Sequence, residues 1–417
     1  MKQPARIQSD SDPNAITIEE ARSRITKSIQ LDLDTEIIAI ENAKGRICAV
    51  DVVSPMSVPS FRASAMDGYA VRVAECNSVL TVRGKSLAGH PGSDMLDVSS
   101  CQRITTGARV PDQADAVVQQ ENVTVVGDQI KINQAPTVGL HIREPGTDSK
   151  VGSPLIKSPC RIGAAEIALA AAHGISSIEV KRPLSVAIFS TGDELCTPGT
   201  SLNKGQIFDA NRPLINALLA SSAVNVIDLG ICADSRQALE EIFARSENAD
   251  LLISSGGVSV GEADHVRSVL ESHGSVALWK IAMKPGRPLT FGFYREQQPY
   301  FGLPGNPVSA AITCLLFVKP AINHLLGLSE VLPPPMQLPL KGQLIKNPGR
   351  TEYQRAFMSI SEEGFWYVAT TGLQDSHVLS SLHLANCLIE LPTDSMGASD
   401  GDLVQVYPFT HFAEPKL

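Results

Sequence analysis

LSVAIFSTGDE, at residues 184–194, is an apolar run of strand length that ends at a glycine-containing turn. The chain then alternates between helical and strand-like patterns, which fall in turn at 211–221, 224–229, 235–244, 251–254, 262–273, 276–281 and 306–326. Helices that alternate with strands are typical of a doubly wound, mostly parallel sheet. Ligands of such sheets bind at the carboxyl ends of the strands. We therefore expect an α/β domain over residues 183–331, with its site in the turns that follow the strands.

The sequence on either side of this α/β domain is organised differently. Residues 61–152 hold short strand-like runs and turns without a long helical pattern, whereas 16–29 and 162–173 have helical periodicity. After a Leu-Pro-Pro-Pro run the patterns are again strand-like. The expected domains are a linker domain in two parts (15–57 and 152–182), an inserted β domain (58–151) and a C-terminal β-barrel-like domain (332–417).

Composition limits the possible classes of function. A net charge of -9 over 417 residues argues against a broad nucleic-acid-binding surface. Charge, proline or glycine interrupts the longest apolar stretches well before the roughly 20 residues that span a bilayer, so we expect no membrane crossing. Residues 1–14 are polar, lack the pattern of a signal peptide and are expected to form a frayed tail. These features favour a cytoplasmic protein.

The eight cysteines are scattered along the chain and form no CxxC pair. The spacing of a structural zinc site is therefore absent. Most of the cysteines have apolar neighbours in the sequence, which is typical of buried thiols. We expect free, mostly buried cysteines, as in proteins of a reducing compartment.

Three glycine-rich turns, at 190–194, 254–261 and 302–307, adjoin elements of the α/β domain. Glycine lets the backbone approach a ligand closely, and hydroxyl groups and free N–H groups at a helix start bind anions. Tight turns between strands and helices also use glycine for structural reasons alone. Three such turns at one edge favour a phosphate-type pocket. The candidate residues are Ser255, Gly256, Gly257, Ser259, Gly305, Asn306 and Pro307.

Acidic residues accompany these turns. Glu194 ends the first turn, Asp234 precedes a helix, and Asp264 falls in the first turn of the next helix. Carboxylates at this edge of a sheet can hold a hard cation such as Mg²⁺, which would bridge phosphates. Helix capping explains Asp234 and Asp264 equally well. Asp250 begins its strand and is left out of the site.

A basic cluster follows the strand at 276–281. It consists of Lys280, Lys284 and Arg287. A pair of lysines alone is usually part of a solvated surface. An acidic protein that binds an anion must concentrate its cations locally, however, and this cluster would suit a phosphate or another oxyanion.

Seven motifs together resemble the MoeA family, which includes the E domain of gephyrin. They run in the same order over about residues 15–410 and are highly specific in combination. The motifs are SAMDGYA (64–70), TGA (106–108), ADAVV (114–118), STGDEL (190–195), SGGVSVG (255–261), KPGRP (284–288) and GLPGNPVSA (302–310). None of the three motifs in the inserted domain could be assigned a chemical role without the resemblance.

The resemblance implies an elongated homodimer of four-domain subunits, with an active site between the α/β domain of one subunit and the inserted domain of the other. The implied reaction joins adenylyl-molybdopterin and molybdate to give molybdenum cofactor and AMP, with a divalent cation, usually Mg²⁺. Glu194 and Asp264 would hold the cation. The adenylyltransferase of the preceding step would be a possible partner.

Position by position, the resemblance assigns further residues to the site. Asp67 and Thr106 match the contribution of the inserted domain, and Glu194, Asp234 and Asp264 match the acids of the α/β domain. The remaining matches are Lys280 and Lys284 as a basic pair, and Arg350, Arg355 and Ser376 in the C-terminal domain.

The sequence also departs from the family pattern. Arg62 and Ala63 stand where an acid or Asn is frequent. The other departures are Gln113 for Gly, Ala210 for Ser, and Asp375 for Gly. Asp375 places a negative charge next to Ser376, which is unfavourable beside an anion site.

The sequence is compatible with three functions. The intact acids and lysines favour a molybdopterin molybdenumtransferase over a scaffold that only binds the pterin nucleotide. The adenylyltransferase of the preceding step shares the α/β domain and is the third candidate. The additional inserted and C-terminal domains favour the molybdenum insertion step.

Overall fold

The computed structural model describes residues 10–257, 265–295, 297–329 and 334–409. The chain divides into two compact units. The first consists of residues 1–36, 45–47 and 181–417, and the second of residues 37–44 and 48–180. Each unit is described by itself.

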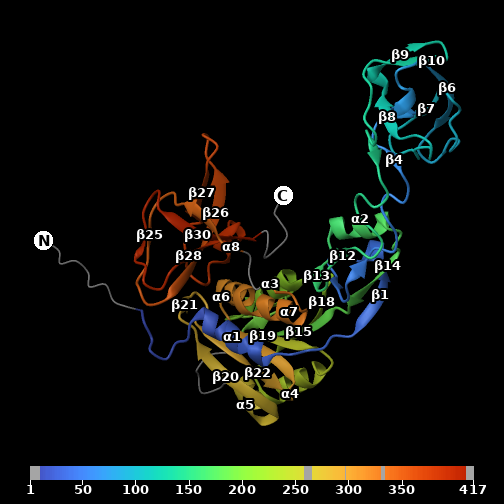
Figure 1. Cartoon of the computed structure of the whole chain (residues 1–417). Helices are drawn as coiled ribbons and strands as arrows, with labels where there is room; N and C mark the ends of the chain where they lie inside the picture. Colours follow the sequence, from blue (N-terminus) through green and yellow to red (C-terminus); the bar gives the residue numbers. More distant parts are fainter. Residues whose placement is uncertain (1–9, 258–264, 296, 330–333, 410–417) are drawn as a thin grey trace. The chain divides into compact units, whose positions relative to one another are not determined.

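The first unit contains a six-stranded sheet whose strands β18, β15, β19 and β23 run parallel (Figure 1). β22 is antiparallel to both of its neighbours, so the mostly parallel sheet predicted for this region is confirmed. The strand order is β18 (Val224–Cys232), β15 (Leu184–Thr191), β19 (Leu251–Ser255), β23 (Gln298–Leu303), β22 (Pro288–Tyr294) and β20 (Gly274–Lys280). The hairpin of β22 and β23 was not predicted from the sequence.

Helices cover both faces of this sheet, because the side chains of β15 that point to either face are apolar. Val186 and Ile188 pack with helices α1, α3, α6 and α7, whereas Ala187 and Phe189 on the opposite face pack with α4 and α5 (Figure 1). Successive side chains of a strand point to opposite faces, so an apolar run of this length is buried on both sides. The helices are α1 (Ile18–Ser28), α3 (Asn211–Leu219), α4 (Arg236–Arg245), α5 (His265–His273), α6 (Pro307–Thr313) and α7 (Lys319–Leu325).

A π-helical segment, η4 (Cys314–Val318), joins α6 to α7. Pro320 has no N–H, so it cannot donate to the carbonyl of Leu316 as a normal helix would require. Arg22 of α1 replaces this bond, because its Nε donates to the Leu316 carbonyl over 2.8 Å. Among the described residues, Pro307–Leu325 is the helix whose length and composition would suffice to cross a membrane, and 83% of its apolar window is buried inside the protein.

The C-terminal part of the first unit is a curled sheet. Strands β21, β26, β28, β30 and β24 follow one another, β27 pairs with β26, and a bridge from Leu340 to Val368 links the β24 end to β27. β21, which leaves the α/β region, runs parallel to β26 and so ties the two regions together. The strands are β21 (Met283–Lys284), β24 (Met336–Pro339), β26 (Thr351–Ile360), β27 (Trp366–Thr370), β28 (Cys387–Leu391) and β30 (Leu403–Pro408).

The second unit holds a six-stranded β sheet and the short helix α2 (Ala164–Ala172). The strand order is β8 (Ala116–Gln119), β5 (Gly68–Val71), β7 (Ser100–Ile104), β6 (Leu80–Ser86), β10 (Gln129–Ile132) and β9 (Val123–Val126). α2 belongs to a separate small core that it shares with β12 (Pro154–Ile156) and β14 (Ser177–Lys181).

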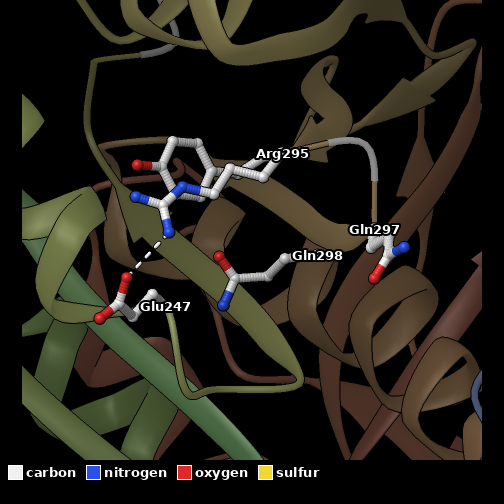
Figure 2. Close-up of a pocket in the computed structure, with 5 residues that line it drawn as sticks. Glu247, Arg295, Gln297 and Gln298 are labelled. Atoms are coloured by element: carbon white, nitrogen blue, oxygen red, sulfur yellow. Dashed lines mark hydrogen bonds and ion pairs between the residues drawn. The ribbon is translucent and has the colours of Figure 1, made fainter.

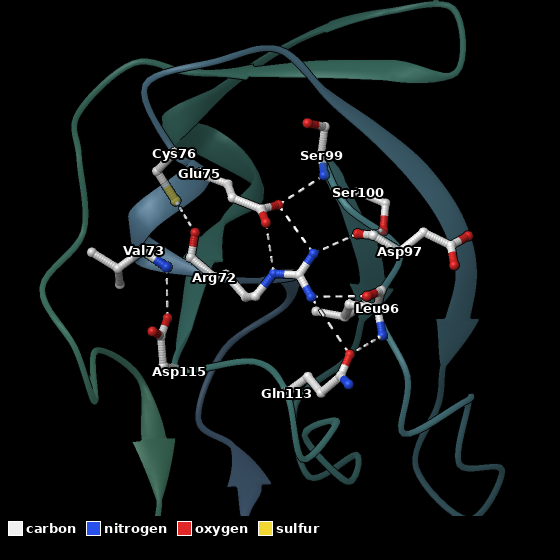
Figure 3. A network of polar contacts seen from close by, with 10 residues as sticks. All are labelled: Arg72, Val73, Glu75, Cys76, Leu96, Asp97, Ser99, Ser100, Gln113 and Asp115. Carbon is white, nitrogen blue, oxygen red and sulfur yellow. Dashed lines mark hydrogen bonds and ion pairs between the residues drawn. The ribbon is translucent and has the colours of Figure 1, made fainter.

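A polar network around Arg72 links the residues that follow β5 to those that precede β7 (Figure 3). The guanidinium donates to both carboxylate oxygens of Glu75, over 2.9 and 3.1 Å. Gln113 accepts from Arg72 and, over 2.8 Å, from the N–H of Leu96. A glycine at position 113 could make neither bond, so this departure from the family pattern has a structural role inside the β domain.

All eight cysteines are free, as predicted, and six of them are buried. Cys160 and Cys196 are half-buried. Burial raises the pKa of the Cys76 and Cys232 thiols to about 11, because the apolar surroundings disfavour the thiolate. These thiols are structural rather than reactive.

Candidate functional site

The first two glycine turns touch each other at the carboxyl ends of the parallel strands. Gly256 has a φ of +91°, and a Cβ at this position would lie 2.4 Å from the Thr191 carbonyl oxygen. The N–H of Gly256 donates to the carbonyl of Leu303, where the third turn begins, over 3.1 Å. Only glycine combines this backbone conformation with so close an approach. The three predicted turns therefore do meet at one edge.

Asn211, at the start of α3, fastens the second turn to the third. Its Nδ2 donates to the Ser255 hydroxyl and to the Gly305 carbonyl, each over 2.7 Å. Asn211 and Ser255 are both buried. Asn211 could not be predicted as a site residue from the sequence, because its partners lie 44 and 94 residues further along the chain.

A second polar group supports the first turn. The Ser190 hydroxyl donates to buried Asp209 over 3.1 Å, and the Nε of Arg212 donates to the other oxygen of the same carboxylate over 3.0 Å. The N–H of Arg212 also donates to Asp209 over 3.2 Å, which caps α3 in place of the side chain that Ala210 lacks. The Thr191 hydroxyl at this edge is buried and has no hydrogen-bond partner among the described residues.

Two predicted acids lie exposed at the same edge. Glu194 folds back over Gly192, whose added Cβ would lie 2.6 Å from its carboxylate, and Asp234 donates its N–H to Asp193 over 3.0 Å. Ser235, not Asp234, caps α4, since its hydroxyl accepts from the N–H of Ala238. The capping role considered for Asp234 is therefore wrong.

Two candidates, Ser259 and Asp264, lie outside the described residues. Within the described residues, no three or more His, Cys, Asp or Glu side chains gather closely enough to hold a metal ion. Asp250, which the sequence analysis left out of the site, forms a two-bond ion pair with Arg182 over 2.6 and 2.8 Å.

The predicted basic cluster gains a fourth member from the C-terminal domain. The pairing of β21 with β26 brings Arg350 close to Lys280, Lys284 and Arg287, and we call these four residues the cation cluster. Lys284 lies 3.4 Å from the buried carboxylate of Glu352. The Nε–H groups of Arg287 and Arg350 are buried and have no acceptor among the described residues. Both arginines therefore keep a free donor for another acceptor.

The N-terminal segment contacts this cluster, so the expectation of a frayed tail is wrong for residues 10–14. Asp12 forms ion pairs with Arg287 and, at 3.6 Å, with Lys280, whereas Asp10 pairs with Arg350. The pKa of Asp10 is lowered mainly by the hydrogen bond that it accepts from Arg350, and the pKa of Asp12 by the bond that it accepts from the N–H of Asn14; the nearby cations lower both further. Residues 1–9 lie outside the described part of the chain.

The C-terminal candidates contact the third turn through Asn306. Its Nδ2 donates to the Ser376 hydroxyl over 3.0 Å, and Pro307 follows it in the first turn of α6. Arg355 is fully buried, and it donates to Ser381 and to the carbonyls of Leu373 and Asp375. Burial lowers the pKa of Arg355 to about 10. Arg355 therefore shapes the loop that presents Ser376.

In the second unit, Asp67 and Thr106 form a local pair. The Asp67 carboxylate accepts from the N–H and the hydroxyl of Thr106, over 2.7 and 2.9 Å. These bonds, and more weakly the charge of Arg103, lower the pKa of Asp67. Arg62, another departure, donates to the Ala114 carbonyl over 3.0 Å and lies 3.5 Å from Glu144.

A separate hollow lies at the opposite edge of the parallel strands (Figure 2). Glu247 precedes β19 and Gln298 begins β23, so both mark the amino ends of these strands. Arg295 donates to Glu247 over 2.8 Å across this hollow. Ligands of doubly wound sheets bind at the other edge, so the hollow is not the candidate site.

Three family models match the chain. They are the MoeA N-terminal region (domain I and II) at 16–174, the probable molybdopterin binding domain at 187–324 and the MoeA C-terminal region (domain IV) at 337–409. The molybdopterin molybdenumtransferase of Haemophilus influenzae is 41% identical over 95% of this chain and 99% of its own length. Gephyrin from Dictyostelium discoideum is 32% identical over 87% of this chain, which matches 57% of that protein.

Solved structures agree with these matches. A molybdopterin biosynthesis MoeA protein from Pyrococcus horikoshii superposes with a TM-score of 0.81 at 26% identity, covering 94% of this chain and 100% of that chain. A second structure of this description has a TM-score of 0.78 at 30% identity, covering 95% and 99%. The sequence motifs, the fold and these relatives lead to the same conclusion: the chain belongs to the MoeA family.

Proposed function

We propose that the chain is a molybdopterin molybdenumtransferase, which converts adenylyl-molybdopterin and molybdate into molybdenum cofactor and AMP. The relatives that carry this name match nearly the full chain. The structural observation that carries the proposal is the cation cluster with its two unpartnered Nε–H groups, on Arg287 and Arg350. A buried donor without an acceptor costs about 1–3 kcal/mol, and an oxyanion offers the acceptors that such donors lack.

The glycine turns would hold the pterin nucleotide. Their backbone groups lie at the carboxyl edge of the parallel strands, where doubly wound sheets bind ligands. The unpartnered Thr191 hydroxyl lies at this edge and offers a further hydrogen bond. Asn211 would keep the second and third turns in register through its bonds to Ser255 and Gly305.

In the proposed step, the pterin dithiolene takes up molybdenum and one molybdate oxygen attacks the adenylate phosphorus. The phosphoanhydride bond breaks, AMP leaves with that oxygen, and the pterin keeps its own phosphate. Negative charge that develops on the phosphates would be stabilised by Lys280 and Lys284. Such transfers depend mainly on positioning and electrostatic stabilisation.

Mg²⁺ is proposed as the divalent cation. The exposed Glu194 carboxylate at the turn edge supplies the hard oxygen ligand that Mg²⁺ prefers, and Asp264 would be the second protein ligand. When bound, the ion would neutralise charge on the phosphates.

We further propose that the chain forms a cytoplasmic homodimer of four-domain subunits. In this dimer, Asp67 and Thr106 of one subunit would complete the active site of the other subunit. The adenylyltransferase of the preceding step would supply the substrate.

The test is AMP release from adenylyl-molybdopterin by the purified chain with Mg²⁺ and molybdate. We expect release that depends on molybdate and that Lys280→Ala and Asp67→Asn each reduce at least tenfold. Lys27→Ala and Asp128→Asn remove exposed charges elsewhere in the same units and should leave the rate unchanged. Binding of the adenylate without AMP release at any molybdate concentration would instead identify a scaffold.

A further inference from the structure

The described N-terminal segment, residues 10–16, follows the cation cluster as an ordered strap. The N–H of Asp10 donates to the carbonyl of Pro348 over 2.8 Å, and the N–H of Ile16 donates to the backbone carbonyl of Lys280 over 2.9 Å. Ile16 also forms a parallel bridge to Ile281. The strap is therefore held by its backbone at both ends, on each side of its two aspartates.

Position 349 is shaped to receive this strap. Gly349 has a φ of +115°, and a Cβ there would lie 2.4 Å from the backbone nitrogen of Ser11. Its own N–H donates to the Thr393 carbonyl over 2.7 Å. A side chain at this position would push the strap away from Arg350, so the contact is a packed feature of the fold.

The strap places carboxylates where an anion would bind. One oxygen of Asp12 accepts from the N–H of Asn14 over 2.9 Å, which orients the other oxygen toward Lys280 and Arg287. Asp10 forms an ion pair with Arg350. The four cations thus meet two strap carboxylates and Glu352 rather than solvent alone.

The two strap contacts leave the cluster only partly satisfied. The Nε–H groups of Arg287 and Arg350 stay unpartnered while the strap is in place. The side chains of Lys280 and Arg287 also remain 49% and 42% exposed. An oxyanion with several acceptor oxygens could bond both to the donors that the two carboxylates occupy and to the donors that they leave free, and so could replace the carboxylates.

We propose that the Asp10–Asp12 strap is an internal competitor that occupies the cation cluster and must be displaced by the incoming oxyanion. This inference rests on the proposed function for the identity of the oxyanion, which is molybdate. The strap keeps the cluster charge-neutralised until substrate arrives and lowers its apparent affinity for anions. A competitor that occupies the cluster 90% of the time would weaken binding about tenfold.

The first experiment measures molybdate binding to the full chain by calorimetry, without the pterin substrate. The Asp10→Asn/Asp12→Asn double variant keeps the shape of both side chains and should bind molybdate about tenfold more tightly than the wild type. Glu19→Gln removes one exposed negative charge from α1, outside the strap, and should leave the affinity within twofold. Unchanged or weaker binding by the double variant would overturn the proposal.

The second experiment needs no variant. Hydrogen exchange of the wild-type chain should show faster exchange at the amides of Asp10 and Ile16 when molybdate is added, because the strap leaves its partners. Slower or unchanged exchange at saturating molybdate would show a strap that stays in place and would refute displacement. Neither readout needs turnover, so a chain that releases no AMP but still exchanges the strap for molybdate would refute only the proposed function.

Discussion

The glycine turns and the cation cluster lie in the same unit and are built in opposite ways. The second and third turns are linked by buried, uncharged hydrogen bonds such as that of Asn211 to Ser255, and the first and second turns meet in a backbone contact that leaves no room for a side chain at Gly256. The cluster is held by ion pairs between partly exposed side chains, such as Lys280 with Asp12. Buried neutral contacts contribute strongly to stability, whereas exposed ion pairs contribute little. Substitutions in the turns should therefore lower the free energy of unfolding, and substitutions in the cluster should weaken ligand binding with little loss of stability.

The largest effect on the free energy of unfolding is expected for Gly256→Ala. The new Cβ would clash with the Thr191 carbonyl, and the positive φ adds about 1–2 kcal/mol of backbone strain. We expect a total loss of about 2–4 kcal/mol in urea denaturation. Gly205→Ala is the matched control, since its φ is +88° but nothing lies within 4 Å of the added Cβ. Equal losses for the two variants would show that the contact between the turns is unimportant.

Asn211→Ala should have the next largest effect. It leaves the buried Ser255 hydroxyl and the Gly305 carbonyl without their shared donor, which is expected to cost about 1–3 kcal/mol. The Michaelis constant for adenylyl-molybdopterin should rise because two turns lose their alignment. Asn216→Ala, at a half-buried position on the same helix, serves as the control. A stable variant with unchanged kinetics would remove Asn211 from the site.

Arg287→Lys, in the cation cluster, should weaken molybdate binding without lowering the free energy of unfolding. It keeps the charge and removes the unpartnered Nε–H, so the free energy of unfolding should not fall, and it should rise by at most the roughly 1–3 kcal/mol that a buried donor without an acceptor costs. Molybdate affinity should fall about tenfold, because a lysine cannot offer the same fork of donors. Calorimetry and urea denaturation on the same preparation separate the two effects. A large loss of stability would contradict the distinction between the two regions.

The smallest effect on stability is expected for Thr106→Val in the second unit. The backbone N–H of Thr106 contributes most to the lowered pKa of Asp67, and the hydroxyl contributes next. The variant keeps the first donor and loses the second, so the pKa of Asp67 should rise part of the way toward its ordinary value. The pKa of Asp67 is lower in the folded protein than in the unfolded chain. The stabilisation contributed by its ionised carboxylate is therefore fully present above the ordinary carboxyl pKa and is lost as the pH falls through the pKa of the folded state. NMR titration should therefore show that Asp67 becomes protonated at a higher pH in the variant, which is also where its stabilising contribution begins to be lost. An unchanged pKa would exclude the hydroxyl as a cause.

The contrast between local and distant interactions also explains what the sequence could predict. The apolar run of β15 and the three glycine turns are local patterns, and they indicated the parallel sheet and the meeting of the turns correctly. Asn211 and Asp12 were missed because their partners lie far along the chain, 275 residues away in the case of Asp12 and Arg287. The polar N-terminal segment has no periodicity of its own, and it is held by backbone hydrogen bonds of Asp10 and Ile16 and by ion pairs, all with residues far along the chain. The hairpin of β22 and β23 was missed because it follows the Pro-Gly-Arg-Pro run and has no helix between its strands.

The most direct test of the proposed function is a single-turnover measurement that follows both products in one sample. Adenylyl-molybdopterin bound to the purified chain would be mixed with molybdate and Mg²⁺, and AMP and pterin-bound molybdenum would be quantified over time. We predict that the two appear at the same rate and in equal amounts, because bond cleavage and metal insertion are one step. AMP release without molybdenum in the pterin, or at the same rate without molybdate, would contradict the account.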